Sequence, residues 1–598
     1  MSHSVLNRRE VSFQLFEVLD TDKLTRRPQF SEHSRETFEA TLDTAEKLAT
    51  DLFAPHNMQA DKHEPTFDGE KVSMIPEVKA AFDAFAQAGF IRGRLSFEEG
   101  GMQLPETVMT SAMGYFTAAN PATTGYPFLT MAAANLIRTF ASDELKERFL
   151  EPMLNGRFSG TMALTEPHAG SSLADIRSNA TPKEDGTYSI KGSKLYISGG
   201  EHELTDNIVH LVLAKIKGAP AGVKGISLFI VPKKRVDSSG QVGEFNGVSL
   251  AGLIHKLGYR GTTSTALSFG DDDECIGYLV GEPHQGLRYM FQMMNEARLG
   301  VGFGSVVIGY QGYQYSLQYA KERTQGRLPS AADPAEPPVA IVEHTDVKRM
   351  LLAQKSYVEG GYALCMYGAS LIDDQHTMEN ESDRQKASLL LDLLTPVIKA
   401  WPSEYCTKAN DLAIQVLGGA GYTREYPVEQ YWRDNRLNPI HEGTNGIQAL
   451  DLLGRKVWLN NGQGLMLLQE EIAKDIKASG EMTKTMATQL ENTLTVVNRT
   501  FMVLADAMKI RGPDVTLANA SCFLNLFGHT IVAWMWLRMA NVAADKLAQA
   551  QGSDVAFYQG KLQAARYFYH WELPLTERDA RLLQNLDETC LSMQPEWF

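Results

Sequence analysis

The sequence contains two places where residue types and spacing favour chemistry. Glu442 stands between Pro439 and Gly443, in a segment of apolar and small residues. Burial among such residues raises the pKa of a carboxyl group toward about 6–7, where it works well as a general base. The glycine-rich turn at 418–421 lacks bulky side chains, so another molecule can approach its backbone. Composition alone leaves two alternatives open: a solvated loop glutamate, and a glycine turn that only ends a helix.

Other motifs are incomplete. The glycines within 300–304 lie in an apolar stripe with helical spacing and do not follow a strand, so we expect close helix packing there and no nicotinamide site. His441 and Glu442 look like the start of a zinc-binding helix, but residue 445 is Asn where the second ligand would stand. We therefore expect no metal. The sequence has neither a G-x-S-x-G elbow nor a Walker A loop, which argues against hydrolases and nucleoside triphosphatases.

The elements that must position these residues are mostly helices. Apolar residues recur at three- and four-residue spacing within 30–155, from 286 to about 455, and again from 465 to 598. Between Gly186 and Gly281 the pattern changes to short runs of β-branched and aromatic residues, separated by Gly, Pro and Asp. This pattern predicts a β domain. We expect strands at 188–190, 194–198, 208–216, 226–231 and 266–269.

Composition limits the class of protein. The chain has 598 residues and a formal net charge of −15, so it has no long-range attraction for nucleic acid or for anionic membranes. Its five cysteines are scattered, which fits a reducing compartment better than a disulfide framework. The N-terminus is polar, and the most apolar stretch, 531–537, is shorter than the roughly 20 residues that a spanning helix needs. We expect a cytoplasmic protein with no membrane span.

Four segments, taken together in this order, resemble the acyl-CoA dehydrogenase family. They are LTEPHAGSS at 164–172, KLYISGG at 194–200, RTQG at 323–326, and the stretch from QVLGGAGY at 415–422 through RD at 433–434 to IHEGTNG at 440–446. The resemblance covers roughly 75–455. With the helical extension after 465, the chain is similar to the branch that has an additional C-terminal domain. That branch includes dehydrogenases of 3-methylthiopropanoyl-CoA and of ordinary fatty acyl-CoAs.

The resemblance implies an α+β fold of four parts. These are an N-terminal helical domain at 1–160, a middle β domain at 161–283, a C-terminal four-helix bundle at 284–460 and an additional helical domain at 465–598. The implied activity is FAD-dependent α,β-dehydrogenation of an acyl-CoA thioester to a trans-2-enoyl-CoA, as in fatty acid β-oxidation. FAD is the implied cofactor and electron-transfer flavoprotein the implied partner. The implied assembly is a homodimer or a higher homo-oligomer.

Two alternatives to this activity remain. A 3-methylthiopropanoyl-CoA dehydrogenase, which would act in dimethylsulfoniopropionate breakdown, is the nearer one. A DNA-binding alkylation-response flavoprotein is remote, because residues 465–598 carry 12 basic and 15 acidic side chains. We expect no nucleic acid as a partner.

Matching the family's motifs residue by residue assigns the site. Glu442 matches the base that removes the α-proton, and Gly443 matches a substrate contact. Ser171, Asn295 and Arg298 match contacts with the CoA portion. The cofactor contacts are Met162, Leu164 and Thr165 at the pyrimidine edge of the flavin, Ser171, Tyr196 packed on the ring, Ser198 near N5, Arg323 on the pyrophosphate, and Gln415, Gly418, Gly419 and Thr444 at the phosphates. Ordinary β alternation would also place Tyr196 and Ser198 on one face.

Three features keep alternatives open. Some branches of the family place the base immediately before the arginine that Arg298 matches, but this chain has Ala297 there, and Glu296 should point about 100° away on a helix. For His441, packing or hydrogen bonding is favoured over tuning of the base. In the additional domain we expect an apolar stripe to pack on the catalytic core or on a second subunit, with membrane docking as the minority alternative. The stripe is Phe523, Phe527, Ile531, Trp534 and Leu537.

Overall fold

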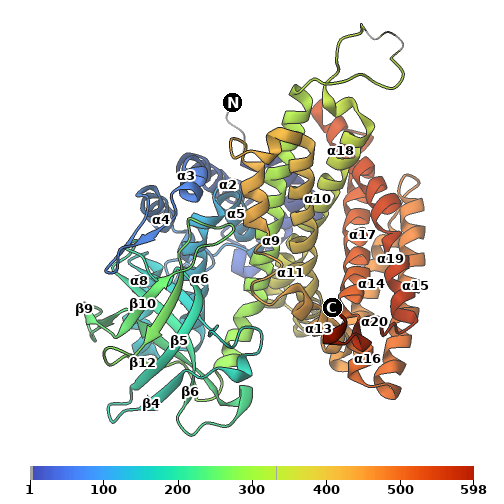
Figure 1. Cartoon of the computed structure of the whole chain (residues 1–598). Helices are drawn as coiled ribbons and strands as arrows, with labels where there is room; N and C mark the ends of the chain where they lie inside the picture. Colours follow the sequence, from blue (N-terminus) through green and yellow to red (C-terminus); the bar gives the residue numbers. More distant parts are fainter. Residues whose placement is uncertain (1–4, 332, 334) are drawn as a thin grey trace. The chain divides into compact units, whose positions relative to one another are not determined.

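The computed structural model describes residues 5–331, 333 and 335–598, apart from the side chains of 292–296. The chain forms two compact units (Figure 1). Of the described residues, one unit comprises 5, 39–104 and 115–297, and the other comprises 6–38, 105–114, 298–331, 333 and 335–598. The domain boundaries expected near 160, 284 and 460 stay predictions. The helices that follow residue 463 lie in the same compact unit as the preceding long helices.

The first unit joins short helices to an eight-stranded sheet. Helices α4 (Glu77–Gln87) and α6 (Pro121–Phe140) pack together, and α6 also packs on strand β3. The strand order is β10-β11-β5-β12-β7-β6-β3, and β4 pairs with both β5 and β6. The strands are β3 (Phe158–Ala163), β4 (Asn179–Pro182), β5 (Tyr188–Ser198), β6 (Asn207–Ile216), β7 (Ile226–Pro232), β10 (Val248–Leu253), β11 (Ser264–Phe269) and β12 (Ile276–Leu279).

Burial explains which strands the sequence predicted. Strand β6 is buried over its first eight residues, so its apolar run is continuous, as expected of a central strand covered on both faces. All five predicted runs lie within β5, β6, β7 and β11. Strands β3, β4, β10 and β12 were not predicted, and none of them shows a regular alternation of buried and exposed residues.

The second unit is built on three long helices, α9 (Gly286–Glu322), α10 (Thr345–Thr377) and α11 (Glu381–Leu417). The first residues of α9, up to Ala297, belong to the first unit. A Cβ atom added at Gly302 of α9 would lie 2.0 Å from the carbonyl oxygen of Ile398 in α11. The two backbones approach closely at this glycine, which confirms the expected helix packing at 300–304. Two short helices follow, α12 (Val428–Asn435) and α13 (Asn445–Gly454).

The additional helices pack onto these long helices. They are α14 (Gln463–Lys477), α15 (Lys484–Ile510), α16 (Pro513–Leu517), α17 (Ala520–Leu547), α18 (Ser553–Tyr567), α19 (Leu575–Gln584) and α20 (Thr589–Ser592). Helix α17 carries the predicted apolar stripe and contacts α10, α11 and α13. The indole of Trp536 in α17 donates a hydrogen bond to the carbonyl of Ser356 in α10 at 3.1 Å. Within the stripe, Trp534 packs edge-on against the ring of Tyr367 in α10, with the ring centroids 5.1 Å apart. Phe523, Phe527 and Ile531 instead line a pocket shared with α14 and α15. The expected packing of the stripe on the bundle is therefore confirmed at Trp534.

Helix α17 is also long and apolar enough to cross a membrane, with a mean hydropathy of 1.3 in its most apolar window. That window is 83% buried by the surrounding protein. Its apolar character therefore belongs to the core of the second unit.

Candidate active site

Glu442 lies in the turn that joins α12 to α13. Its φ is 53° and that of Gly443 is 85°, so two consecutive residues adopt the left-handed conformation. Thr444 follows as the N-cap of α13, where its hydroxyl accepts a hydrogen bond from the N–H of Ile447 at 3.3 Å. A left-handed conformation is unfavourable for a residue with a side chain, and it persists where neighbouring contacts hold it. The turn is therefore built to present the Glu442 side chain.

Burial governs the electrostatics of Glu442. It raises the pKa of the carboxyl group, while the positive charges of Arg298 and Lys399 act to lower it. The net result is a pKa above the ordinary value for glutamate, which is the direction expected from the sequence. A carboxylate with a raised pKa is a stronger base at neutral pH, so this group suits proton abstraction.

Lys399 was missed by the sequence analysis. It lies on α11 with no exposed surface, and its ammonium nitrogen lies 2.7 Å from the carbonyl oxygen of Gly443 and 3.2 Å from Oδ1 of Asn445. Burial lowers its pKa to about 7, against the attraction of Glu442. The signal available in the sequence was a lysine within the apolar run 393–401, where an unpaired charge needs an explanation.

Arg298 provides the second positive charge near the base. Its guanidinium forms an ion pair with Asp451 of α13 at 3.2 Å, and only 5% of the residue is exposed. Its Nε has no hydrogen-bond partner among the described residues. The predicted contact of Arg298 with CoA stays a prediction. Asn295, its predicted companion, and the alternative carboxylate Glu296 have side chains that lie outside the described residues.

Two further polar side chains support the turn. His441 Nε2 lies 3.0 Å from Oδ1 of Asn438, and burial, with repulsion from Lys399, lowers its pKa to about 3. The imidazole is therefore neutral and hydrogen-bonded, as expected, and brings no charge to the base. Gln448, which the sequence analysis missed, donates from Nε2 to the carbonyl of Glu442 at 3.1 Å. No motif in the sequence pointed to Gln448.

In the first unit, a buried ion pair holds the segment that contains the predicted pyrimidine-edge residues. The ammonium of Lys194 donates to Glu166 at 2.9 Å and to the carbonyls of Leu164 at 3.0 Å and Leu213 at 2.8 Å. Glu166 also accepts two backbone hydrogen bonds from 177–178. Burial lowers the pKa of Lys194 to about 8. For Glu166, burial acts to raise the pKa, but Lys194 and these donors hold it below its ordinary value. These bonds join the loop after β3 to β5 and β6.

Strand β5 places its exposed residues beside this loop. The N–H of Leu195 donates to the carbonyl of Thr165 at 2.9 Å. The pairing of β5 with β11 shifts register here, and Tyr196 has a φ of 60°. This bulge separates buried Lys194 from Tyr196, which is 61% exposed, although simple alternation would put both on one face. Tyr196 and Ser198 are thus both exposed in the stretch of β5 whose backbone bonds to Thr165.

The remaining predicted cofactor residues of the first unit differ in exposure. Met162, in β3, and Leu164 are half-buried, and Ser171 is exposed in the loop that follows. The structure thus brings five of the predicted first-unit residues onto or next to β3 and β5. Ser171 lies beyond these residues, in the loop that follows β3. Its predicted contact with the cofactor or with CoA stays a prediction.

In the second unit, the predicted phosphate contacts lie at the ends of helices. Arg323 is exposed, one residue after α9 ends, and bonds to Gln325 at 3.0 Å. Gln415 is exposed in the last turn of α11, and Gly418, with a φ of 60°, uses its own N–H to cap that helix. Gly418 therefore ends the helix as expected, and because this role does not exclude a phosphate contact, that contact stays a prediction. A Cβ atom at Gly418 or Gly419 would meet no atom within 4 Å, so the backbone there is open to a ligand.

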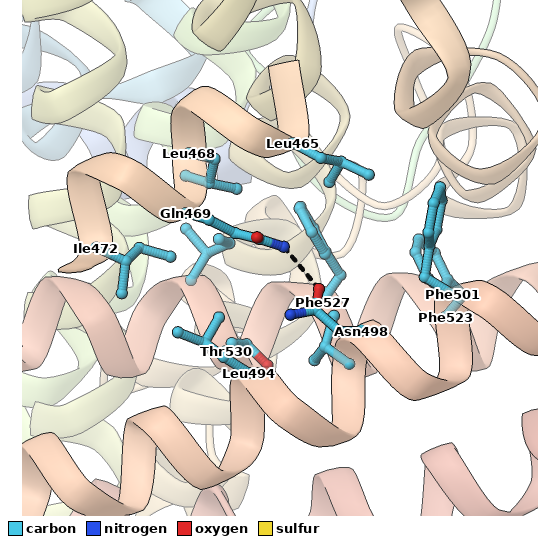
Figure 2. A pocket seen from close by; sticks show the side chains of 12 residues that line it. Leu465, Leu468, Gln469, Ile472, Leu494, Asn498, Phe501, Phe523, Phe527 and Thr530 are labelled. Carbon is cyan, nitrogen blue, oxygen red and sulfur yellow. Dashed lines mark hydrogen bonds between the residues drawn. The ribbon is translucent and has the colours of Figure 1, made fainter. Parts of the chain in front are cut away.

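An apolar pocket lies among the additional helices α14, α15 and α17 (Figure 2). Gln469 and Asn498 form a hydrogen bond of 2.6 Å across it, and the other lining residues are apolar apart from Thr530. Because no lining residue is ionisable, this pocket offers no acid or base for the reaction.

Comparison with known proteins places this site in a family. Sequence profiles of the acyl-CoA dehydrogenase N-terminal, middle and C-terminal domains match residues 35–157, 161–271 and 284–457, and one described as acetyl-CoA dehydrogenase C-terminal like matches 468–594. The chain is 35% identical to 3-methylmercaptopropionyl-CoA dehydrogenase of Ruegeria pomeroyi, with 94% of each protein covered. It is 34% identical to a broad-specificity linear acyl-CoA dehydrogenase of Mycobacterium tuberculosis over the full length of both.

A solved structure, that of an acyl-CoA dehydrogenase from Bacillus anthracis, shares the fold with a TM-score of 0.73 at 20% identity, covering 92% of this chain and 88% of that one. The chain belongs to the acyl-CoA dehydrogenase family. It is an FAD-dependent oxidoreductase of the branch with an additional C-terminal domain. In each unit by itself, the described residues suit a part of the cofactor. In the first unit Tyr196 offers an exposed ring, and in the second unit the glycines at 418–419 leave room at the backbone.

Proposed function

We propose that this chain oxidises linear acyl-CoA thioesters to trans-2-enoyl-CoAs, with Glu442 as the base. The observation that carries the proposal is a half-buried carboxyl group with a raised pKa, held in a strained turn between two buried cations. The carboxylate of Glu442 takes the α-proton of the substrate and becomes the neutral acid. Bound FAD would accept the hydride that leaves the β-carbon. Arg298 and Lys399 keep the carboxylate ionised before that step, because their charges oppose the effect of burial.

The cofactor contacts follow from exposure and position. We assign the face at Thr165, Tyr196 and Ser198, with Met162 and Leu164, to the flavin ring. Arg323, Gln415, Gly419 and Thr444 are assigned to its phosphates, where a guanidinium fork and open backbone suit a doubly charged group. The Bacillus anthracis relative was solved with FAD.

The substrate class has two candidates. The relative that matches over its whole length acts on linear acyl-CoAs of broad range. The relative from Ruegeria acts on 3-methylmercaptopropionyl-CoA, in which a sulfur atom replaces a methylene of a linear chain, so the same pocket shape suits both. By resemblance to the family we also propose electron-transfer flavoprotein as the acceptor, a cytoplasmic location, a role in fatty acid oxidation and at least a homodimer.

A panel of thioesters tests the substrate. Anaerobic mixing of the purified yellow protein with short, medium and long linear acyl-CoAs and with 3-methylthiopropanoyl-CoA should bleach the flavin absorbance with at least one of them. The rates rank the candidates. A flavin that no member of the panel reduces would contradict the proposed function.

Replacement of the base tests the site. Glu442→Gln keeps the shape of the side chain but cannot accept a proton, so flavin reduction should slow by about 10²–10⁴-fold, the usual contribution of a general base, while flavin stays bound. The exposed carboxylate of Glu425 offers a matched control, and Glu425→Gln should reduce flavin at the normal rate. In the unmodified protein the rate should rise with pH as Glu442 loses its proton, with a midpoint above the ordinary glutamate range. Normal turnover by Glu442→Gln would exclude this residue as the base.

A further inference from the structure

The base-bearing turn is tied to α11 by one buried side chain. Lys399 Nζ lies 2.7 Å from the carbonyl oxygen of Gly443 and 3.2 Å from Oδ1 of Asn445. It therefore bonds to two of the three residues that directly follow Glu442. These contacts account for two of its three ammonium hydrogens. Among the described residues, no carboxylate forms an ion pair with Lys399. The acidic group that acts on it is Glu442.

Such an arrangement needs a reason, because a buried ammonium without a close carboxylate is unfavourable. The turn that it holds contains two consecutive left-handed residues, Glu442 and Gly443. Strained backbone of this kind persists only where its surroundings over-determine it. Removing the tie would release the turn and remove one of the two positive charges beside the base.

We propose that Lys399 is a positioning residue for the reaction: it fixes the strained turn that presents Glu442 and supplies a positive charge that keeps the carboxylate ionised. The inference rests on the proposed role of Glu442 as the base. The other charged or titratable groups that face this site are Arg298 from α9, Asp451 from α13 and His441 from the turn itself. Arg298 has the larger effect on Glu442, but it shares Asp451 with Arg455, and His441 is neutral. Among the described residues, Lys399 is the cation beside the base that forms no ion pair, and Glu442 is the carboxylate that attracts it.

Replacement of Lys399 by Met removes the charge and the donors at similar length. Lys399→Met should keep bound flavin, and flavin reduction by a good acyl-CoA should slow by about ten- to a hundredfold, the effect of losing a charge-assisted hydrogen bond. The loss should fall on kcat more than on KM. Burial lowers the pKa of Lys399 to about 7, so its side chain is positively charged below that pH. The midpoint of the pH–rate profile should move to higher pH in the variant, because the pKa of Glu442 rises when this neighbouring charge is removed.

A matched control separates this effect from the general loss of a buried lysine. Lys456 is 5% exposed and pairs with Asp392 at 2.6 Å, away from the turn. Lys456→Met should leave the rate and the pH midpoint unchanged. An equal fall in both variants, or an unshifted midpoint in Lys399→Met, would overturn the proposal. If Lys399→Met does not fold, Lys399→Arg is measured in its place. A pH–rate midpoint equal to that of the wild type supports the role of the charge, and a midpoint at higher pH contradicts it.

The outcome differs from failure of the proposed function. If wild-type flavin is bleached and Glu442→Gln is inactive while Lys399→Met behaves as wild type, only the role of Lys399 is wrong. If no acyl-CoA bleaches the wild type, the proposed function itself is wrong.

Discussion

At the residue scale, Glu442 combines two unfavourable features, a left-handed backbone and a half-buried carboxylate whose pKa burial raises. Each is unfavourable by itself, and strained backbone alone costs about 1–3 kcal/mol. Three contacts oppose them: the Thr444 cap, the bond from Gln448 to the Glu442 carbonyl, and the tie from Lys399. The base is therefore a property of the whole turn. Substitutions that leave the carboxylate in place but change the turn should still affect the reaction.

Gly443→Ala tests this view. A Cβ atom at this position would lie 2.7 Å from Nε2 of Gln448, and a φ of 85° is unfavourable for alanine. The substitution should destabilise the turn by about 1 kcal/mol or more and slow flavin reduction at least about tenfold. Gly446→Ala is the control, because its Cβ would meet only Thr444 Oγ1 at 3.8 Å. Stopped-flow flavin reduction compares the two, and equal rates in both variants would contradict the argument.

The sequence predicted the base but not its supports. Glu442 lies in a motif that can be recognised, and its apolar neighbours already indicated burial. Lys399 lies 43 residues before Glu442 in the sequence, on α11. Gln448 lies on α13, the helix that follows the turn. Which side chains reach the turn depends on how α11 and α13 pack, and no local pattern encodes that. Residue types alone could indicate only that a lysine in an apolar run needs a partner.

At the element scale, a helix crossing supports the base-bearing turn in the second unit, and a strand bulge exposes Tyr196 in the first unit. The strand β6 was recovered because its run of apolar residues is continuous, as a buried strand requires. The bulge at Tyr196 was not predicted, because it depends on the pairing of β5 with β11. It explains how buried Lys194 and exposed Tyr196 lie two residues apart in one strand. Register comes from the partner strand as well as from the sequence of the strand itself.

The crossing of α9 and α11 gives a prediction at this scale. A Cβ atom at Gly302 would overlap the carbonyl of Ile398, which directly precedes Lys399. Gly302→Ala should push the helices apart and destabilise the protein by about 1–3 kcal/mol. Flavin reduction should slow as well, because α11 carries the tie to the turn. Gly464→Ala in α14, whose Cβ would make an ordinary contact at 3.5 Å, should keep the wild-type melting temperature. Equal melting temperatures for the two variants would refute the close crossing.

At the scale of the whole molecule, the first residues of the second unit join its last helices. Lys561 of α18 is fully buried and forms ion pairs with Glu10, which lies in α1 (Arg8–Ser12), and with Glu359 of α10 at 2.9 Å. Burial acts to raise the pKa of Glu359, but Lys355 and Lys561 hold it below its ordinary value. For Glu10, burial raises the pKa against the attraction of Lys561. Contacts between residues about 550 positions apart have no signature in a local pattern, so the sequence analysis did not predict this cluster.

Removal of the central cation should destabilise the second unit. Lys561→Met leaves Glu10 buried without its partner, and breaking a buried pair in this way costs about 3–5 kcal/mol. Glu10→Gln combined with Lys561→Met removes both charges, so the double variant should melt at a higher temperature than Lys561→Met alone, although below the wild type. Glu359 keeps its ion pair with Lys355 in both variants. Thermal melting of the flavin-loaded protein ranks the melting temperatures of the wild type and the two variants. A double variant less stable than Lys561→Met would show that the charge of Glu10 does not depend on Lys561.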